Sequence, residues 1–273
     1  MRAFRSPAEI SLGVVDDHPP FRAGLLAGLT AAGFRSLTVA GSTEELGDLR
    51  PEVVLCDLEF PEGCRSGREA VEYLVARGCL VIGFSHLARR EAQLDVLAGG
   101  ARGFVMKSEE TSVYCEAAGE VARGGYWIGP RLAGYLIEDA DNRPLAKDEI
   151  GPAERALLTA LAEGDTQAEF EHAAKLPDGG SIPLMDRVFD AERRRNRVIT
   201  PSVREFQIVE LIGRQGLRSA EAARRLFITE ATLKSHLENI RDKYLLAHPH
   251  APRDLPPRDA SRRWAEEFDG RRS

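Results

Sequence analysis

The sequence lacks a long apolar run. No stretch approaches the roughly 18–20 apolar residues of a membrane span, and residues 1–10 hold no apolar segment long enough for a signal peptide. We therefore expect a cytoplasmic protein with no membrane partner. Cysteine is also scarce. The four cysteines form no CxxC pair, which argues against a disulfide framework and against a zinc finger.

The chain also lacks an overall basic charge. Its formal net charge of −6 excludes a uniformly basic nucleic-acid coat. The charge is uneven, however, because residues 199–273 hold 14 Lys and Arg against 11 Asp and Glu. An acidic front and a mildly basic back are typical of a sensor part joined to a DNA-binding part. The length of 273 residues agrees with two domains and leaves room for a third small module.

Short apolar runs alternate with helical stretches in the front half of the chain. The runs that we expect to be strands are 10–16, 37–40, 53–57, 80–85 and 103–106. Nearly continuous apolar strands separated by helices indicate a parallel sheet that is buried on both faces. Ligands of such sheets bind outside the carboxyl ends of the strands.

Charged and hydroxyl side chains stand at those strand ends. They are Asp16, Asp17, Asp57, Ser85 and Lys107. Converging carboxylates repel one another, whereas a bound Mg²⁺, which prefers oxygen ligands, would stabilise them. A carboxylate, a divalent cation, a hydroxyl and an ammonium together form a site for phosphoryl transfer to an aspartate.

These residues stand in motifs that resemble the receiver domain of two-component response regulators. The motifs are Val-Val-Asp16-Asp17-His-Pro, Val-Leu-Cys-Asp57-Leu-Glu-Phe-Pro61, Gly-Phe-Ser85 and Gly-Ala-Arg-Gly-Phe-Val-Met-Lys107. The segment Gly124-Gly-Tyr-Trp-Ile-Gly-Pro130 resembles the end of a receiver in the NarL subfamily. The resemblance covers residues 9–137. It implies a flavodoxin-like, doubly wound, five-stranded parallel sheet.

The resemblance also implies a role for each site residue. Asp57 would accept the phosphoryl group, and Ser85 and Lys107 would contact it. The Mg²⁺ ligands would be Asp16, Asp17, Asp57 and the backbone carbonyl of Glu59. The donor would be a sensor histidine kinase, and we expect no independent enzyme activity. Phe104 would occupy the aromatic switch position, although a Phe in that strand is equally typical of core packing.

The back half of the chain predicts a helix-turn-helix. Thr200 is a suitable cap for a first helix that begins at Pro201 and ends at Gly216. A short second helix follows over 219–226, and a third begins after the cap Thr229. A third helix of this kind can enter the major groove of DNA.

The segment from Gly216 to Leu237 resembles the LuxR-type helix-turn-helix without a gap. The resemblance implies that Lys234 reads or approaches bases, whereas other polar residues contact the DNA backbone. These are Thr229, Thr232, Ser235 and Lys243. The stretch from Glu205 to Gly216 is two or three residues longer than the pattern, which predicts an altered first helix or turn.

Two further segments flank the predicted helix-turn-helix domain, which we place at 199–247. Residues 138–198 form a helical linker or insert, in which Pro152 precedes Pro201 by 49 residues in a similar context. This insert is either a degenerate second helix-turn-helix or a plain helical spacer. The tail, 248–273, should hold a short amphipathic helix in which Trp264 and Phe268 pack on the domain.

The whole pattern favours a transcriptional regulator that binds double-stranded DNA and is controlled by aspartyl phosphorylation. We expect a homodimer when the protein is active. Two alternatives stay open from the sequence. The receiver could be controlled by a ligand or a protein partner without phosphorylation. The output could instead act through protein–protein interaction without binding DNA.

Overall fold

The protein folds into two compact units, Met1–Arg193 and Arg194–Ser273, in a computed structural model. The structure describes residues 5–61, 63–86, 90–142, 150–199, 201, 203–248 and 251–270. No helix in this described part of the chain is both long and apolar enough to cross a membrane. Each unit is described separately below.

A five-stranded parallel sheet forms the centre of the first unit. Its strands are β1 (Ser11–Val15), β2 (Ser36–Ala40), β3 (Val53–Asp57), β4 (Leu80–Ser85) and β5 (Gly103–Met106). They lie in the order β2-β1-β3-β4-β5. The predicted doubly wound parallel sheet is therefore confirmed. Because all the strands run parallel, their carboxyl ends meet at one edge.

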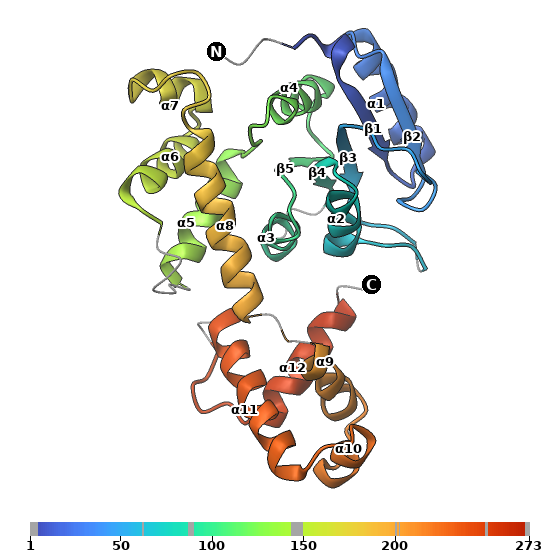
Figure 1. Cartoon of the computed structure of the whole chain (residues 1–273), viewed down its shortest axis with the longest axis vertical. Helices are drawn as coiled ribbons and strands as arrows, with labels where there is room; N and C mark the ends of the chain where they lie inside the picture. Colours follow the sequence, from blue (N-terminus) through green and yellow to red (C-terminus); the bar gives the residue numbers. More distant parts are fainter. Residues whose placement is uncertain are drawn as a thin grey trace. The chain divides into compact units, whose positions relative to one another are not determined.

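Helices cover both faces of this sheet (Figure 1). The core on one face includes residues of α1 (Pro19–Ala31) and α4 (Thr111–Ala122), whereas the core on the other face includes residues of α2 (Gly67–Ala76) and α3 (Arg90–Ala98). A 3-10 turn, η1 (Pro7–Glu9), precedes the first strand. β3 is buried along its whole length, which explains its continuous apolar sequence.

The segment between β2 and β3 differs from the prediction. We expected a helix in each connection between strands, but residues 41–49 form bends and turns. Gly47 adopts a left-handed backbone (φ 54°), which an α-helix does not allow. The side chain of Arg77 donates to the carbonyl of Gly47 and so holds the turn from the neighbouring helix α2.

Four more helices continue the first unit beyond the sheet. They are α5 (Pro130–Asn142), α6 (Pro152–Glu163), α7 (Gln167–Ala173) and the start of α8 (Ile182–Ile199). Buried residues from this region, among them Leu136, Leu158 and Phe189, join the core that α2 and α3 form with the sheet. Residues 150–193 are thus a packed part of the first unit.

The second unit is entirely helical. After the end of α8 it holds α9 (Val203–Ile208), η2 (Val209–Arg214), α10 (Ser219–Arg225), α11 (Glu230–Ala247) and α12 (Pro257–Gly270). The expected all-α helix-turn-helix fold is confirmed. The side-chain oxygen of Thr229 accepts a hydrogen bond from the backbone N–H of Thr232 (3.1 Å) and caps α11 as predicted. The predicted cap Thr200 lies outside the described residues.

An altered first helix is present where the sequence predicted one. Residues 209–214 are π-helical, and the backbone N–H of Gln215 donates to the carbonyl of Glu210, five residues earlier (3.0 Å). A π-turn absorbs extra residues inside a helix without ending it. The chain then turns at Gly216 (φ 66°).

The tail helix α12 completes the core of the second unit. The side chain of Trp264 is 3% exposed and meets the ring of Tyr244 edge-on at 5.5 Å, as predicted for Trp264. The side chain of Phe268 lies outside the described residues. A Cβ atom on Gly213 would lie 2.3 Å from the carbonyl oxygen of Ser261, so η2 and α12 approach closely at this point.

We expect Gly213→Ala to destabilise the second unit by about 1–3 kcal/mol, because a methyl group must displace the backbone of α12. Denaturant unfolding, followed by circular dichroism, measures the change. Gly24→Ala is the matched control, since a Cβ at this helical position has open space around it. Equal loss, or no loss, in the two variants would show that the close approach is unimportant.

Candidate phosphoryl-acceptor and nucleic-acid sites

Two buried carboxylates and a lysine meet at the carboxyl edge of the sheet. Asp16 follows β1, Asp57 ends the neighbouring strand β3, and Lys107 follows β5. Both aspartates are fully buried. The Lys107 Nζ atom lies 2.8 Å from Asp16 Oδ2 and 2.6 Å from Asp57 Oδ2. The ammonium group therefore neutralises part of the negative charge that the two strands bring together.

The surroundings of Lys107 favour its charged form. Burial lowers the pKa of Lys107, but hydrogen bonds to Asp16 and Asp57 outweigh this effect and raise it. The ammonium also lies 5.1 Å from the ring centroid of Phe21 and 5.4 Å from that of Phe84. Aromatic faces attract cations, so these rings hold the ammonium at the sheet edge.

The carboxylate of Asp57 is buried but remains available to ionise. Its Oδ1 atom accepts hydrogen bonds from the backbone N–H groups of Leu58 (2.7 Å) and Glu59 (3.2 Å). Burial raises the pKa of Asp57 to about 6, against the opposing effect of Lys107. At neutral pH the group is thus largely a carboxylate, the form in which it can act as a nucleophile.

The same edge can present a set of metal ligands. One ligand atom from each of Asp16, Asp17, His18 and Asp57 lies within 4.8 Å of the others. Three of the four donors are carboxylate oxygens, which suit Mg²⁺. His18 was not selected from the sequence, although it directly follows the paired aspartates. Its Nδ1 atom lies 2.7 Å from Asp17 Oδ1, and its side chain is largely exposed.

Ser85 and Phe104 complete the set of predicted residues in this unit. Ser85 ends β4, and its hydroxyl donates to Glu59 Oε1 (3.1 Å). The structure thus brings the Glu59 side chain to the site, whereas the sequence predicted a role for its backbone carbonyl. Phe104 is 6% exposed and packs in the core beside β4. This position satisfies the packing interpretation and leaves the switch role a hypothesis.

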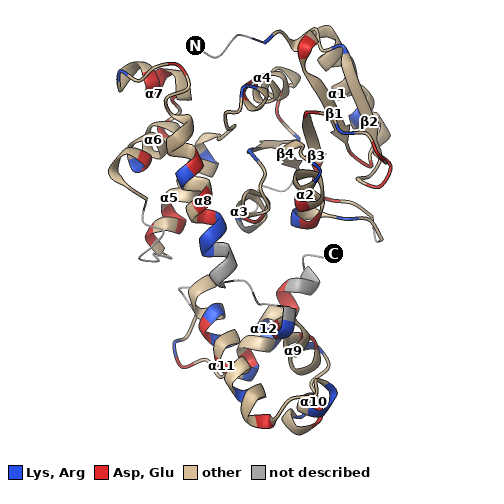
Figure 2. Ribbon diagram, in the orientation of Figure 1, with Lys and Arg blue, Asp and Glu red and all other residues tan. Residues whose placement is uncertain are grey.

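The predicted DNA-contacting residues lie on α11 or at its start. Lys234 and Ser235 are exposed on this helix, and so are Thr229 and Thr232. Thr229 also uses its hydroxyl locally, since its Oγ1 lies 2.8 Å from Thr232 Oγ1. Figure 2 shows basic residues on α10 and charges of both signs along α11.

Lys243 has a structural partner that the sequence did not indicate. Its Nζ atom donates to Glu205 Oε2 (2.7 Å), and the Glu205 side chain is only 5% exposed. Burying a carboxylate is costly, and a nearby ammonium group offsets part of that cost. Lys243 thus joins α11 to α9.

We expect Lys243→Ala to destabilise the second unit by about 1–3 kcal/mol, because it leaves the Glu205 carboxylate buried without this donor. Denaturant unfolding measures the effect. The double variant Glu205→Gln/Lys243→Ala should recover part of the loss, since it removes the charge of the buried carboxylate. Unchanged stability of Lys243→Ala would mean that the ion pair contributes nothing.

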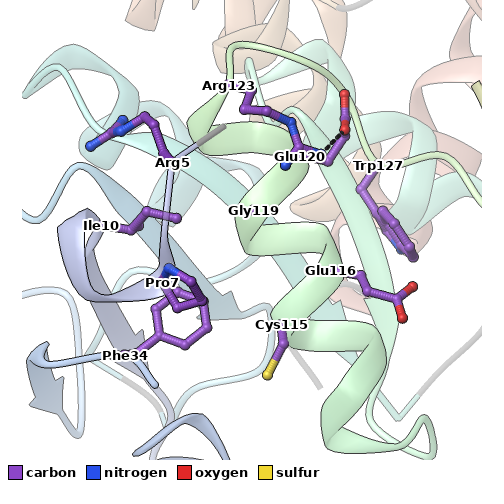
Figure 3. Close-up of a pocket in the computed structure, with 10 residues that line it drawn as sticks. All are labelled: Arg5, Pro7, Ile10, Phe34, Cys115, Glu116, Gly119, Glu120, Arg123 and Trp127. Atoms are coloured by element: carbon purple, nitrogen blue, oxygen red, sulfur yellow. Dashed lines mark hydrogen bonds and ion pairs between the residues drawn. The ribbon is translucent and has the colours of Figure 1, made fainter. Parts of the chain in front are cut away.

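A separate pocket of about 370 Å³ lies between the start of the chain and α4 (Figure 3). Its lining mixes apolar groups with both charge signs, and Arg123 pairs with Glu120 within it. The lining includes none of the predicted site residues. The candidate phosphoryl site is therefore the sheet edge and not this pocket.

Comparison with known proteins finds transcriptional regulators of similar sequence. No family model matches the chain. The chain is similar to the DNA-binding transcriptional activator DevR/DosR of Mycobacterium tuberculosis, with 27% identity over 198 residues, 67% of this chain and 82% of the relative. It is also similar to the transcriptional regulatory protein DegU of Brevibacillus brevis, with 24% identity over 242 residues, 86% of this chain and 87% of the relative.

In sequence the chain is thus similar to transcriptional regulators that include DevR/DosR, DegU and NarL. This similarity is consistent with the observed order of a five-stranded parallel sheet followed by a helical unit. Among solved structures, it is similar to the response regulator ChrA of a heme-sensing two-component system. The TM-score is 0.40 with 21% identity, over 95% of this chain and 98% of that one.

Proposed function

We propose that the protein is a DNA-binding transcriptional regulator controlled by phosphorylation of Asp57. The observation that carries this proposal is the bridge from Lys107 to Asp16 and Asp57 at the carboxyl edge of the sheet. We assign the receiver role to residues 9–137 and the DNA-binding role to 199–247, with the tail 248–273 supporting the latter.

The chemistry follows from the positions of these groups. A carboxylate oxygen of Asp57 attacks the phosphorus of a phosphohistidine on a sensor kinase. The new P–O bond forms as the P–N bond breaks, and the imidazole leaves. Lys107 then stabilises the negative charge on the phosphoryl oxygens, and the Ser85 hydroxyl, released from Glu59, donates to one of them.

Mg²⁺ is the cofactor that fits this edge. Asp16, Asp17, Asp57 and the carbonyl of Glu59 would hold it, and it would neutralise charge on the transferring phosphoryl group. The donor set supports this assignment because it is made mainly of carboxylate oxygens. Lys107 offsets only part of the charge of the aspartates, so the site has a remaining preference for a cation.

The second unit supplies the output of this proposal. Its helix α11 carries an exposed lysine and exposed hydroxyls, groups that can donate to bases and phosphates from a helix in the major groove. Phosphorylation at Asp57 would favour a homodimer, in which two copies of α11 bind two half-sites of double-stranded DNA.

A gel-shift experiment tests the proposed function. The full chain is incubated with Mg²⁺ and acetyl phosphate, its phosphorylation is measured by intact mass, and it is then mixed with genomic DNA fragments. We expect one phosphoryl group per chain and tighter binding to a subset of fragments. Phosphorylation without DNA binding would favour an output through protein contacts. DNA binding without any phosphorylation would favour control by a ligand or partner.

A further inference from the structure

The helices α6, α7 and α8 have the same plan as the helix-turn-helix of the second unit. They hold 12, 7 and 18 residues. In the second unit, α9 and η2 hold six residues each, α10 holds 7 and α11 holds 18. The order and the lengths of the three helices are therefore the same in the two segments.

The turn that follows the second helix begins with the same backbone in both segments, although the connection to the third helix is longer in the first unit (174–181) than in the second (226–229). Apart from glycines, Lys175 and Phe227 are the only described residues with positive φ, and both have φ 55°. The hydrogen bonds around them match as well. The N–H of Leu176 donates to the carbonyl of Glu171 (2.8 Å), as the N–H of Ile228 does to that of Ala223 (3.0 Å). Each matched pair is 52 residues apart.

The buried faces of the first helices match too. The buried residues are Glu154, Leu157, Leu158 and Leu161 in α6, and Glu205, Ile208, Val209 and Ile212 across α9 and η2. The spacing is the same, and each set begins with a buried glutamate. That glutamate pairs with a basic side chain on the third helix, Arg187 in one segment and Lys243 in the other.

The two segments differ in what lies in the groove between their second and third helices. In the second unit this groove is a pocket lined by Ser219, Glu230, Ala231, Lys234 and Leu237. In the first unit the positions equivalent to Ser219, Lys234 and Leu237 hold Gln167, Asp186 and Phe189. Gln167 is matched to Ser219 by the 52-residue spacing of the turn. Asp186 and Phe189 are matched by counting from the first residues of α8 and α11, which are 48 residues apart because the connection in the first unit is four residues longer.

All three of these residues contact Tyr126 of the receiver. The Tyr126 hydroxyl donates to Asp186 Oδ1 (2.5 Å), and its ring centroid lies 4.3 Å from that of Phe189. The side-chain amide of Gln167 donates to the Tyr126 carbonyl. Tyr126 is 2% exposed. It therefore fills the groove as a buried anchor.

The chemistry of Tyr126 suits this position. Burial, together with the hydrogen bond to Asp186, raises the pKa of Tyr126 to about 12, so the phenol stays protonated and donates. The guanidinium of Arg102, which precedes β5, lies 4.9 Å from the centroid of the same ring. A carboxylate at the position equivalent to Lys234 would repel phosphates, so this groove is unsuited to DNA.

We propose that α6–α8 is a second helix-turn-helix unit, whose groove between the second and third helices binds Tyr126 of the receiver instead of DNA. The comparison with a DNA-reading unit rests on the proposed function of α10 and α11. The docking itself rests only on the contacts within the first unit. The partner of this surface is thus the receiver's own segment 124–130, which lies next to β5 through the bridge between Gly103 and Trp127.

Hydrogen–deuterium exchange on the full chain tests the docking. We expect Tyr126→Phe to speed amide exchange in α7 and α8 about three- to tenfold, because it removes the hydrogen bond to Asp186. Asp186→Asn should speed exchange less, because its carboxamide oxygen still accepts but more weakly than a carboxylate. The double variant should be no faster than Tyr126→Phe alone, since no hydrogen bond is left to weaken. The matched control is Asp190→Asn, an exposed carboxamide replacement one turn further along α8. Unchanged exchange in both single variants, with the fold retained, would overturn the docking.

DNA binding by the same variants tests the second part of the proposal. Asp186→Asn and Tyr126→Phe should leave the affinity for a specific fragment within about twofold, whereas Lys234→Ala should lower it about tenfold or more. A loss in Asp186→Asn as large as that in Lys234→Ala would mean that α8 reads DNA. If Lys234→Ala has no effect, the proposed DNA-binding role of α11 fails, while the exchange result still decides the docking.

Discussion

Asp57→Asn is expected to abolish phosphorylation of the full chain by acetyl phosphate in the presence of Mg²⁺. The wild-type chain should gain one phosphoryl group, because Asp57 combines a buried carboxylate with Lys107 at 2.6 Å and a hydroxyl at the end of the adjacent strand. The amide of asparagine has nearly the same shape but is not a nucleophile towards phosphorus. Intact mass spectrometry measures the incorporated phosphoryl group, and the retardation of the phosphorylated chain on a gel provides a second measurement.

Two comparisons make this result specific. Asp48→Asn changes an exposed aspartate in the turn before β3 and should be phosphorylated like the wild type. Lys107→Met should bind acetyl phosphate poorly. It should also be phosphorylated more slowly, because the activation free energy should rise by about 2–4 kcal/mol, the range for loss of one charge-stabilising group. Incorporation into Asp57→Asn at the wild-type level would show that another residue is the acceptor.

Lys234→Ala is expected to weaken binding to a specific DNA fragment by about 1–3 kcal/mol if the lysine reaches a base edge. The residue is exposed on α11, so its removal should not unfold the unit. Fluorescence anisotropy with labelled duplexes at several salt concentrations measures the affinity. A base contact would reduce discrimination between fragments, whereas a phosphate contact would weaken binding to all fragments and lower the salt slope by about 0.9.

Arg262→Ala is the matched control for this experiment. It removes the same charge from the same unit, but from an exposed position on the tail helix α12. Its effect should be small and equal on all fragments. If Lys234→Ala and Arg262→Ala bind alike, α11 does not lie in the groove.

The strands could be predicted from the sequence because helices cover both faces of the parallel sheet, so each strand is a short, nearly continuous apolar run. Strand β3, for example, is buried at every position and reads Val-Val-Leu-Cys-Asp. The connection after β2 could not be predicted in the same way. Its apolar residue Leu46 is buried in turns rather than in a helix, and sequence spacing alone does not distinguish the two.

The candidate sites likewise include residues that could be predicted from the sequence and contacts that could not. Asp16, Asp57 and Lys107 could be placed together because each stands at the end of a predicted strand. The pair of Lys243 and Glu205 depends on how α11 packs against α9, and 38 residues separate its members. The contact of Tyr126 with Asp186 spans 60 residues and depends on the fold of α7 and α8. The spacing of residues along the sequence does not predict contacts between such distant segments.

The position of β2 at the edge of the sheet also affects how the protein behaves in solution. Among the residues that the structure describes, β2 pairs with β1 alone, so one row of its backbone N–H and C=O groups lies at the border of the sheet. Val39 on this strand is 45% exposed. Another chain could extend the sheet there, which is a route to aggregation. The strand limits this hazard through its shortness, since it has five residues and begins with Ser36.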